Sequence, residues 1–314
     1  MSLKCLISDV MHDSIVPLLE GIGLEPVYRP DITRQGIIDT IDQFDGLIIR
    51  SKTRIDSQII EKATRLQFIG RGGAGIDNLD VDIIKKAGIK IFNAPEGNRN
   101  AVGEQAVGML LSLLNKLQKA DKEVRNMVWD REGNRGHELL GKTVGLIGCG
   151  NMGQSFAQKL SGFGCKVLAY DKYKYNYTDN YVVETTLEDI FKNSDILSLH
   201  IPLTKETKGL VNNEFIDRFE KSIYLINTAR GEVVETEAIV NGLQSGKLVG
   251  AALDVLENEK LTKMTGKQQK SFQYLSNSQK TILTPHVAGW SVESYKMINT
   301  VLVDKIREFL KGEI

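Results

Sequence analysis

A glycine motif near the middle of the chain constrains its fold more than any other feature. The segment Gly141–Gly153 reads GKTVGLIGCGNMG, an apolar run followed by Gly148, Gly150 and Gly153 in the spacing G-x-G-x-x-G. A stretch compatible with a helix follows, and the next apolar run ends at Asp171. This order of strand, glycine turn, helix, strand and acidic residue predicts a dinucleotide-binding unit rather than a glycine-rich turn of no function.

Each glycine of the motif has a structural reason. Gly148 permits the tight turn, Gly150 lets a pyrophosphate approach the backbone, and Gly153 lets the helix pack closely on the strand. Asn151 and Met152 begin the predicted helix, whose N-terminal N–H groups favour phosphates. The carboxylate of Asp171 accepts hydrogen bonds from ribose hydroxyls and repels a 2′-phosphate, so we expect NAD rather than NADP.

Composition excludes several other classes of protein. The chain has 314 residues, enough for two domains, and 40 basic residues balance 40 acidic ones. This balance argues against a nucleic-acid or membrane-surface partner, and no apolar run approaches the length of a membrane span. Cys5, Cys149 and Cys165 have no metal-ligand or disulfide spacing. We therefore expect a cytoplasmic protein with reduced thiols and no metal.

Strand-like runs alternate with helical patterns along the chain, which predicts α/β architecture with parallel sheets. Strands are expected at 3–7, 24–27, 46–49, 67–69, 90–92, 144–147, 166–170, 196–200, 224–227, 249–254 and 281–283. Helices are expected at 15–20, 34–41, 56–62, 82–86, 100–119, 152–160 and 292–310. The prediction is two doubly wound domains, in which a Rossmann-type nucleotide domain (100–289) is inserted into a smaller flavodoxin-like substrate domain (1–99 with 290–314). A ligand is expected in a cleft between such domains.

Polar residues follow several predicted strands, at the edge where open α/β sheets bind ligands. They are His200-Ile-Pro202, Asn227-Thr-Ala-Arg230-Gly231, Asp254-Val-Leu-Glu-Asn-Glu259 and Pro285-His286.

Seven ordered segments of the chain resemble the D-isomer-specific 2-hydroxyacid dehydrogenases, and together they cover nearly its whole length. They read GRGGAGIDNLD, NAPEGN, GLIGCGNMG, SLHIPLTKET, INTARGE, AALDVLENE and TPHVAG. In appearance the chain is nearest to the 3-phosphoglycerate dehydrogenase branch, without room for a regulatory domain. The resemblance implies a catalytic arginine, glutamate and histidine at Arg230, Glu259 and His286.

These residue types suit the reduction of a 2-keto acid. A histidine near its pKa donates the proton, a carboxylate favours its protonated form, and an arginine binds the substrate carboxylate as a fork. The alternatives are a capping or core histidine for His286 and a surface ion pair for Arg230. Glu257 lies near Glu259, but the spacing from Asp254 in the family pattern selects Glu259.

The resemblance also implies ligand-binding residues outside the catalytic set. A cofactor groove is expected at His200, Pro202, Thr207, Thr228, Ala229 and Asp254, and the substrate carboxylate is expected at the loop of Gly73, Ala74 and Gly75. Arg50 and Arg71 match positions that receive a phosphate, and Arg131 matches an arginine from a partner subunit. These cations favour a phosphorylated substrate and a homodimer, although Arg50 also occurs with unphosphorylated acids and Arg131 has an alternative place in a dimer interface.

The chain departs from the family after Glu259. Lys260 stands where proline is common, and a long polar stretch follows over 261–280. We expect a solvated insertion there, with a lid as the alternative.

The expected activity is NAD-dependent oxidation of D-3-phosphoglycerate, or its reverse. Hydroxypyruvate or glyoxylate reduction, or broad D-2-hydroxyacid dehydrogenation, is the alternative within the same class. An NAD-sensing corepressor-like protein is a more remote one.

Overall fold

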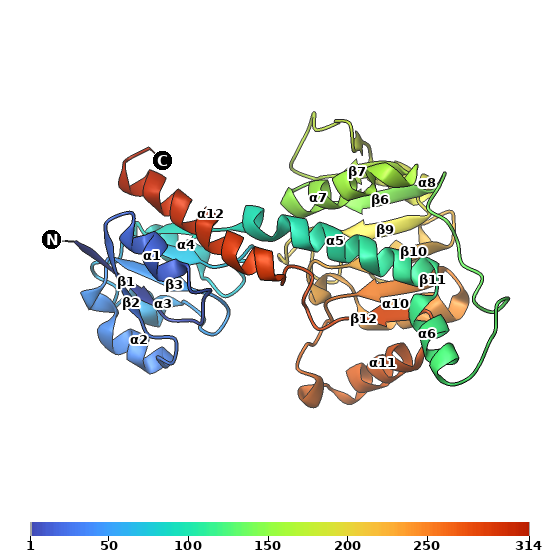
Figure 1. Cartoon of the computed structure of the whole chain (residues 1–314), viewed down its shortest axis with the longest axis horizontal. Helices are drawn as coiled ribbons and strands as arrows, with labels where there is room; N and C mark the ends of the chain where they lie inside the picture. Colours follow the sequence, from blue (N-terminus) through green and yellow to red (C-terminus); the bar gives the residue numbers. More distant parts are fainter. Residues whose placement is uncertain (1, 314) are drawn as a thin grey trace. The chain divides into compact units, whose positions relative to one another are not determined.

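The computed structural model describes residues 2–313, which form two compact α/β units (Figure 1). The first comprises residues up to Arg99 together with those from Trp290 onward, and the second is Asn100–Gly289. Helix α5 (Pro95–Leu114) contains the boundary between them.

The first unit is a parallel five-stranded sheet in the order β2-β1-β3-β4-β5. Its strands are β1 (Leu3–Ile7), β2 (Leu24–Tyr28), β3 (Gly46–Ile49), β4 (Phe68–Arg71) and β5 (Lys90–Asn93). Its helices are α1 (Ile15–Glu20), α2 (Arg34–Thr40) with the 3₁₀ turn η1 (Ile41–Gln43), α3 (Ser57–Ile60), α4 (Val81–Lys86) and α12 (Val292–Leu310). This is the flavodoxin-like strand order that the sequence predicts.

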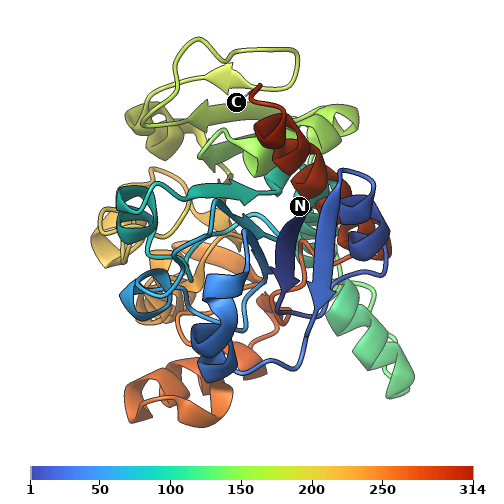
Figure 2. The same ribbon diagram turned by 90° about the vertical axis from the view of Figure 1, so that its left-hand side faces the viewer.

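Helix α12 belongs to the core of the first unit although it lies at the far end of the sequence. Its apolar side chains Leu302 and Ile306 are fully buried in one cluster with Phe68 of β4. Figure 2 shows α12 beside α1, which it contacts. The apolar face of the helix therefore completes a core that the first 99 residues leave open.

The second unit is a parallel seven-stranded sheet in the order β12-β11-β10-β9-β6-β7-β8. Its strands are β6 (Thr143–Ile147), β7 (Lys166–Tyr170), β8 (Val183–Glu184), β9 (Ile196–Leu199), β10 (Ile223–Asn227), β11 (Leu248–Leu253) and β12 (Thr281–Leu283). Its helices are α6 (Leu117–Arg125), α7 (Asn151–Leu160), α8 (Leu187–Asn193), α9 (Asn213–Asp217), α10 (Thr236–Ser245) and α11 (Gly266–Asn277), with 3₁₀ turns η2 (Ser161–Phe163), η3 (Gly231–Val233) and η4 (Leu261–Lys263).

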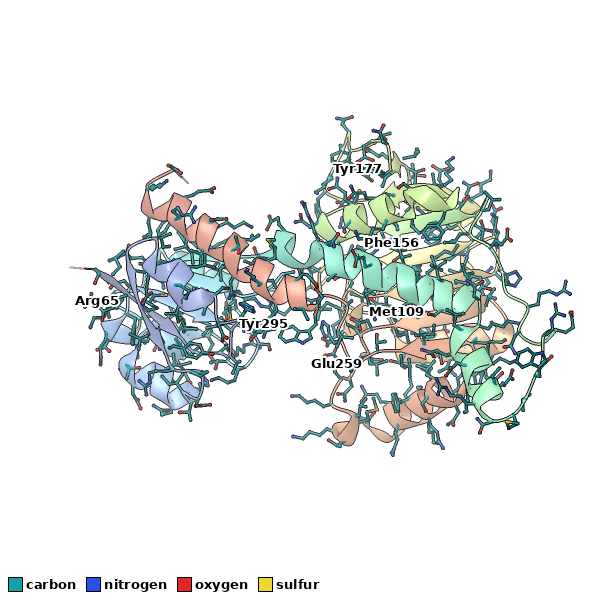
Figure 3. The ribbon with its side chains drawn as sticks, in the orientation of Figure 1. Arg65, Met109, Phe156, Tyr177, Glu259 and Tyr295 are labelled. Carbon is teal, nitrogen blue, oxygen red and sulfur yellow. The ribbon has the colours of Figure 1, made fainter. Side chains whose placement is uncertain are left out.

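Strand order reverses between β6 and β9, because the chain passes from β6 outward through β7 and β8 and then returns. This reversal is the switch point at which doubly wound sheets bind nucleotides. Phe156 of α7 and Met109 of α5, labelled in Figure 3, are buried in one cluster of this unit. The two parallel α/β sheets confirm the predicted fold class.

The long helix expected over 100–119 is wrong in its bounds. It begins earlier, at Pro95, and ends at Leu114, and α6 follows after Lys116, whose φ of 53° is left-handed. The carbonyl of Leu114 accepts a hydrogen bond from the N–H of His137 at 3.0 Å. A segment distant in the sequence therefore satisfies the end of α5, which helix periodicity does not reveal.

The polar stretch over 261–280, which we expected to be a solvated insertion, is mostly exposed but forms a helix. It contains α11, which begins with a capping box between Thr265 and Gln268. Leu275 of α11 is fully buried, and the helix contacts α10 and β12. The stretch is therefore packed on the second unit along one face of the helix.

Candidate active site and cofactor site

The glycine motif forms a tight cradle at the switch point of the second unit. Gly148 has a φ of +93°, and a Cβ there would lie 2.4 Å from the carbonyl oxygen of His200. A Cβ on Gly153 would lie 2.3 Å from the carbonyl oxygen of Gly148. At Gly150, by contrast, a Cβ would meet nothing within 4 Å. Two glycines are thus required by the fold itself, and Gly150 opens onto space that a pyrophosphate would use.

Asp171 lies beside this cradle, at the end of β7. Its carboxylate accepts hydrogen bonds from the N–H of Cys149 at 2.9 Å and of Tyr173 at 3.0 Å. Lys172 pairs with Glu206 at 2.6 Å, so the charge of this neighbouring lysine is compensated elsewhere. Asn151 and Met152, both partly buried, form the first turn of α7. Strand β6 therefore leads to the N-terminus of α7, and the adjacent strand β7 leads to the carboxylate of Asp171. A dinucleotide requires both groups at these positions.

His200 and Thr228 follow the neighbouring strands β9 and β10. Burial lowers the pKa of His200 to about 4, and its Nε2 lies 2.9 Å from Oγ of Ser198. The hydroxyl oxygen of Thr228 is buried without a hydrogen-bond partner within residues 2–313. A buried hydroxyl with no partner is costly unless a ligand bonds to it. This orphan supports the predicted cofactor role of Thr228 and of the adjacent, buried Ala229.

The loop after β9 is held by its own hydrogen bonds. Thr207 Oγ1 donates to the carbonyl of Pro202 at 2.7 Å, and the same oxygen accepts from the N–H of Thr204 at 2.8 Å. The structure places Pro202 and Thr207 together, and their contact with a cofactor stays a prediction.

Arg230 is fixed at the end of β10 by its backbone. Its carbonyl accepts from Asn227 Nδ2 at 3.0 Å, and its Nη1 donates to the carbonyl of Ala229 at 2.7 Å. The next residue, Gly231, has no room for a Cβ, which would lie 1.8 Å from the carbonyl oxygen of Leu256. This close approach brings Arg230 beside the loop that carries Glu259.

His286 and Glu259 form an ion pair, as the sequence predicts. His286 Nδ1 lies 2.9 Å from Glu259 Oε1, and both side chains are about half exposed. The hydrogen bond to Glu259 raises the pKa of His286, against the opposing effects of burial and of Arg230. Glu259, labelled in Figure 3, lies on the loop after β11. The structure brings together all three residues of the expected catalytic set in the second unit.

Asp254 holds the turn that carries His286. Its carboxylate accepts from Thr284 Oγ1 at 2.6 Å, from the N–H of Val287 at 2.9 Å and from the N–H of Ala288 at 2.8 Å. Within this turn His286 has a φ of 57°, which is unusual for a residue with a side chain. The buried carboxylate therefore stabilises a strained backbone at a functional position. No pattern in the sequence indicates this role of Asp254, and its predicted contact with the nicotinamide stays a prediction.

The loop predicted to bind the substrate carboxylate lies in the first unit, and hydrogen bonds to its carbonyl oxygens hold it in place. The carbonyl of Gly73 accepts from the N–H of Ala94 at 2.9 Å, and that of Ala74 accepts from Asn93 Nδ2 at 2.6 Å. A Cβ on Gly73 would lie 1.7 Å from Nη1 of Arg71, so the guanidinium lies over this glycine. These bonds do not use the N–H groups of Ala74 or Gly75, which stay candidates for an anion.

Arg50 lies next to this loop in the first unit, at the end of β3. Its guanidinium carbon lies 4.2 Å from the ring centre of Trp290 and 5.3 Å from that of Tyr295. Burial lowers the pKa of Arg50, and Tyr295 and Asp9 oppose that shift. The two aromatic rings hold the cation in one orientation. The sequence analysis did not find Trp290 or Tyr295, because their link to Arg50 is tertiary.

Arg131 is exposed on the segment that follows α6 in the second unit. This segment also has exposed apolar side chains, of which Trp129 is 80% and Met127 94% exposed. Whether Arg131 reaches a partner's site stays a prediction.

Two other features, a metal site and a membrane-spanning helix, are absent from the described residues. Residues 2–313 contain no group of three or more His, Cys, Asp or Glu side chains arranged to hold a metal ion. No helix within the same range is long and apolar enough to cross a membrane.

Comparisons with known proteins show the family of this chain. A family model described as "D-isomer specific 2-hydroxyacid dehydrogenase, NAD binding domain" matches residues 107–288. The chain belongs to this family. It is an NAD-dependent oxidoreductase, and its cofactor is NAD.

Individual relatives carry several names. A hydroxypyruvate reductase of Thermotoga maritima is 36% identical over 96% of this chain and 96% of its own length. A D-3-phosphoglycerate dehydrogenase of Methanocaldococcus jannaschii is 32% identical over 99% of this chain, but the chain spans only 58% of that protein. Among solved structures, D-lactate dehydrogenase of Aquifex aeolicus, complexed with NAD and lactic acid, has a TM-score of 0.83 at 28% identity, with 98% of this chain and 96% of that chain covered.

The glycine cradle yields a matched pair of substitutions. Gly153→Ala forces a methyl group against the carbonyl of Gly148, so we expect the free energy of unfolding to fall by about 1–3 kcal/mol. Gly150→Ala meets no protein atom, so we expect an unchanged Tm and a Kd for NADH raised about 10-fold or more. Thermal melting and NADH fluorescence titration measure both. Equal effects of the two substitutions on Tm would contradict the assigned roles.

Proposed function

We propose that this enzyme interconverts D-3-phosphoglycerate and 3-phosphohydroxypyruvate, with Arg230, Glu259 and His286 as its catalytic residues. The observation that carries the chemistry is the 2.9 Å ion pair of His286 and Glu259 beside Arg230. In serine biosynthesis this oxidation supplies the keto acid from which the amino acid is made.

His286 moves the proton. Because Nδ1 bonds to Glu259, Nε2 is the ring nitrogen available to the substrate. In oxidation, neutral His286 takes the proton of the substrate hydroxyl, and in reduction the imidazolium returns it to the carbonyl oxygen. A bound nicotinamide would supply the hydride acceptor for oxidation, or the hydride donor for reduction, at the carbon that carries this oxygen. In oxidation the proton thus goes to His286 and the hydride to the cofactor, and in reduction both return to the substrate.

Arg230 binds and polarises the substrate. Its guanidinium is always charged and donates in a fork that matches a carboxylate. Its charge also lowers the pKa of His286, but the bond to Glu259 is the larger influence on that pKa. An anchored carboxylate fixes the reacting carbon relative to the proton donor.

The phosphorylated substrate is supported by the cations of the first unit. Arg50 follows β3 and Arg71 is the last residue of the adjacent strand β4. The aromatic rings of Trp290 and Tyr295 hold Arg50 in place. A dianionic phosphate is the group that two such cations favour. The alternative, reduction of hydroxypyruvate or glyoxylate, is favoured by the Thermotoga relative, which the chain matches over nearly its full length.

A homodimer is part of this proposal. Exposed apolar side chains gather on α6 and the segment after it, at Leu117, Val124, Met127, Val128 and Trp129. Apolar surface of this kind marks an interaction site, and two-fold pairing of identical chains is the commonest assembly. Arg131 follows this surface directly, which supports its predicted role across the dimer. The unpaired state of the three cysteines supports the expected cytoplasmic location.

Two substitutions test the catalytic set. His286→Ala removes the proton donor, so we expect kcat to fall by about 10²–10⁴. Arg230→Ala removes charged hydrogen bonds worth roughly 1.5–3 kcal/mol each, so we expect kcat/KM to fall at least about 10-fold. The Kd for NADH should stay near the wild-type value in both. Turnover with a panel of 2-keto acids measures the effect, and an active His286→Ala variant would exclude the proposed acid–base role.

The choice of substrate is tested at Arg50. Loss of its bond to a phosphate costs roughly 1.5–3 kcal/mol, so Arg50→Ala should raise the KM for 3-phosphohydroxypyruvate about 10- to 100-fold. The KM for glyoxylate, which has no phosphate, should hardly change. Arg54→Ala, at an exposed arginine of the same unit, is the matched control. Equal changes for the two substrates would favour the reductase of unphosphorylated acids.

A further inference from the structure

The loop that carries Glu259 is joined to the inserted helix α11 by a hydrogen bond that does not involve Glu259 itself. We propose that Asn258 and Gln268 are positioning residues that hold Glu259 against His286, so that the inserted segment supports the catalytic pair. The inference rests on the proposed role of that pair.

Asn258 fixes the backbone on both sides of Glu259. Its Oδ1 accepts a hydrogen bond from the N–H of Lys260 at 2.9 Å, which bridges across Glu259. Its Nδ2 donates to Gln268 Oε1 at 3.1 Å and lies 3.3 Å from the carbonyl of Lys263. The oxygen of the Asn258 amide therefore bonds within the loop, and its nitrogen bonds to the helix.

Gln268 links the Glu259 loop to the first turn of α11. Its Oε1 also accepts from the N–H of Thr265 at 3.0 Å, and its own N–H donates to Thr265 Oγ1 at 3.3 Å. One amide oxygen therefore completes the capping box of α11 and receives Asn258. Helix α11 is itself anchored, because Leu275 is fully buried and its carbonyl accepts from Thr281 Oγ1 at 2.5 Å.

The inserted segment also bounds the space around the pair. A cavity of about 360 Å³ is lined by Leu261 and Phe272 of the segment and by Glu259 and His286. Leu256, Leu283 and Pro285 complete most of its apolar wall. Displacement of α11 would therefore open the pair to water on this side, where water weakens the attraction between the two charges.

Three charged groups act on His286, and they follow two adjacent strands of the sheet. Glu259 and Asp254 follow β11 and raise its pKa, whereas Arg230, after β10, lowers it. Arg230 and Asp254 have hydrogen bonds of their own that do not involve Asn258 or Gln268. Loss of the Asn258–Gln268 bond should thus weaken only the contribution of Glu259 and lower the pKa of His286.

Asn258→Ala and Gln268→Ala test the proposal, with Gln269→Ala as the matched control. Gln269 is exposed and is the next residue of the same helix, with no side-chain hydrogen bond among residues 2–313. The chain has four histidines, so NMR of the imidazole protons can be assigned and the pKa of His286 read directly. We expect both variants to lower this pKa and to lower kcat about 10-fold. This is a smaller loss than the roughly 100-fold loss of rate that a misplacement of about 1 Å causes. The control should change neither.

Two further variants separate positioning from loss of the helix cap. Gln268→Glu keeps an acceptor for Asn258 and for the cap, so we expect kcat near wild type and a His286 pKa that is not lowered. The double variant Asn258→Ala with Gln268→Ala should lower kcat little more than either single change, because both remove one contact.

An unshifted His286 pKa in Asn258→Ala, with a native Tm, would overturn the proposal. The NMR titration does not depend on turnover, so this outcome is distinct from failure of the proposed acid–base role. That failure would appear as activity in His286→Ala.

Discussion

The hydrogen bonds of one buried carboxylate organise the catalytic end of the second unit. Asp254 directly follows β11 and accepts three hydrogen bonds from the segment after β12, which fixes the left-handed turn at His286. Because β11 and β12 are parallel neighbours, both segments begin at the same edge of the sheet. Glu259 lies on the continuation of the β11 segment, so its distance from His286 depends on this turn. Asp254 therefore fixes the backbone that positions His286.

Close backbone contacts fix the loops around the glycine motif, as the hydrogen bonds of Asp254 fix the turn at His286. Gly148 and Gly231 each lie where a Cβ would overlap a carbonyl oxygen of a neighbouring loop, and a Cβ on Gly153 would overlap that of Gly148. These contacts draw together the loops that follow β6, β9, β10 and β11. The orphan hydroxyl of Thr228 and the open space at Gly150 lie within the same set of loops. The fold thus brings the glycine cradle and the His286–Glu259 pair to one edge of one sheet.

Local signals made much of this architecture predictable from the sequence. The glycine spacing and Asp171 depend on backbone geometry within one βαβ unit, and helix 292–310 depends on its apolar period and on Ser291 as its cap. The break after Leu114 could not be predicted, because the N–H that satisfies it belongs to His137. The stacking of Trp290 on Arg50 joins residues far apart in the sequence, and the contact of Asn258 with Gln268 requires a folded α11. In each case the missing information is a tertiary partner rather than a propensity.

In the proposed mechanism, Glu259 is the group that keeps His286 basic enough to carry the proton. Glu259→Gln keeps the shape of the side chain and removes its charge, so the imidazolium loses its main support. Reduction requires protonated His286 and declines as pH rises through its pKa, whereas oxidation requires the neutral form and rises there. The decisive measurement is the pH profile of kcat/KM in both directions for wild type and Glu259→Gln. We predict that both transitions move to lower pH in the variant. An unmoved profile would show that Glu259 does not set the pKa of the proton donor.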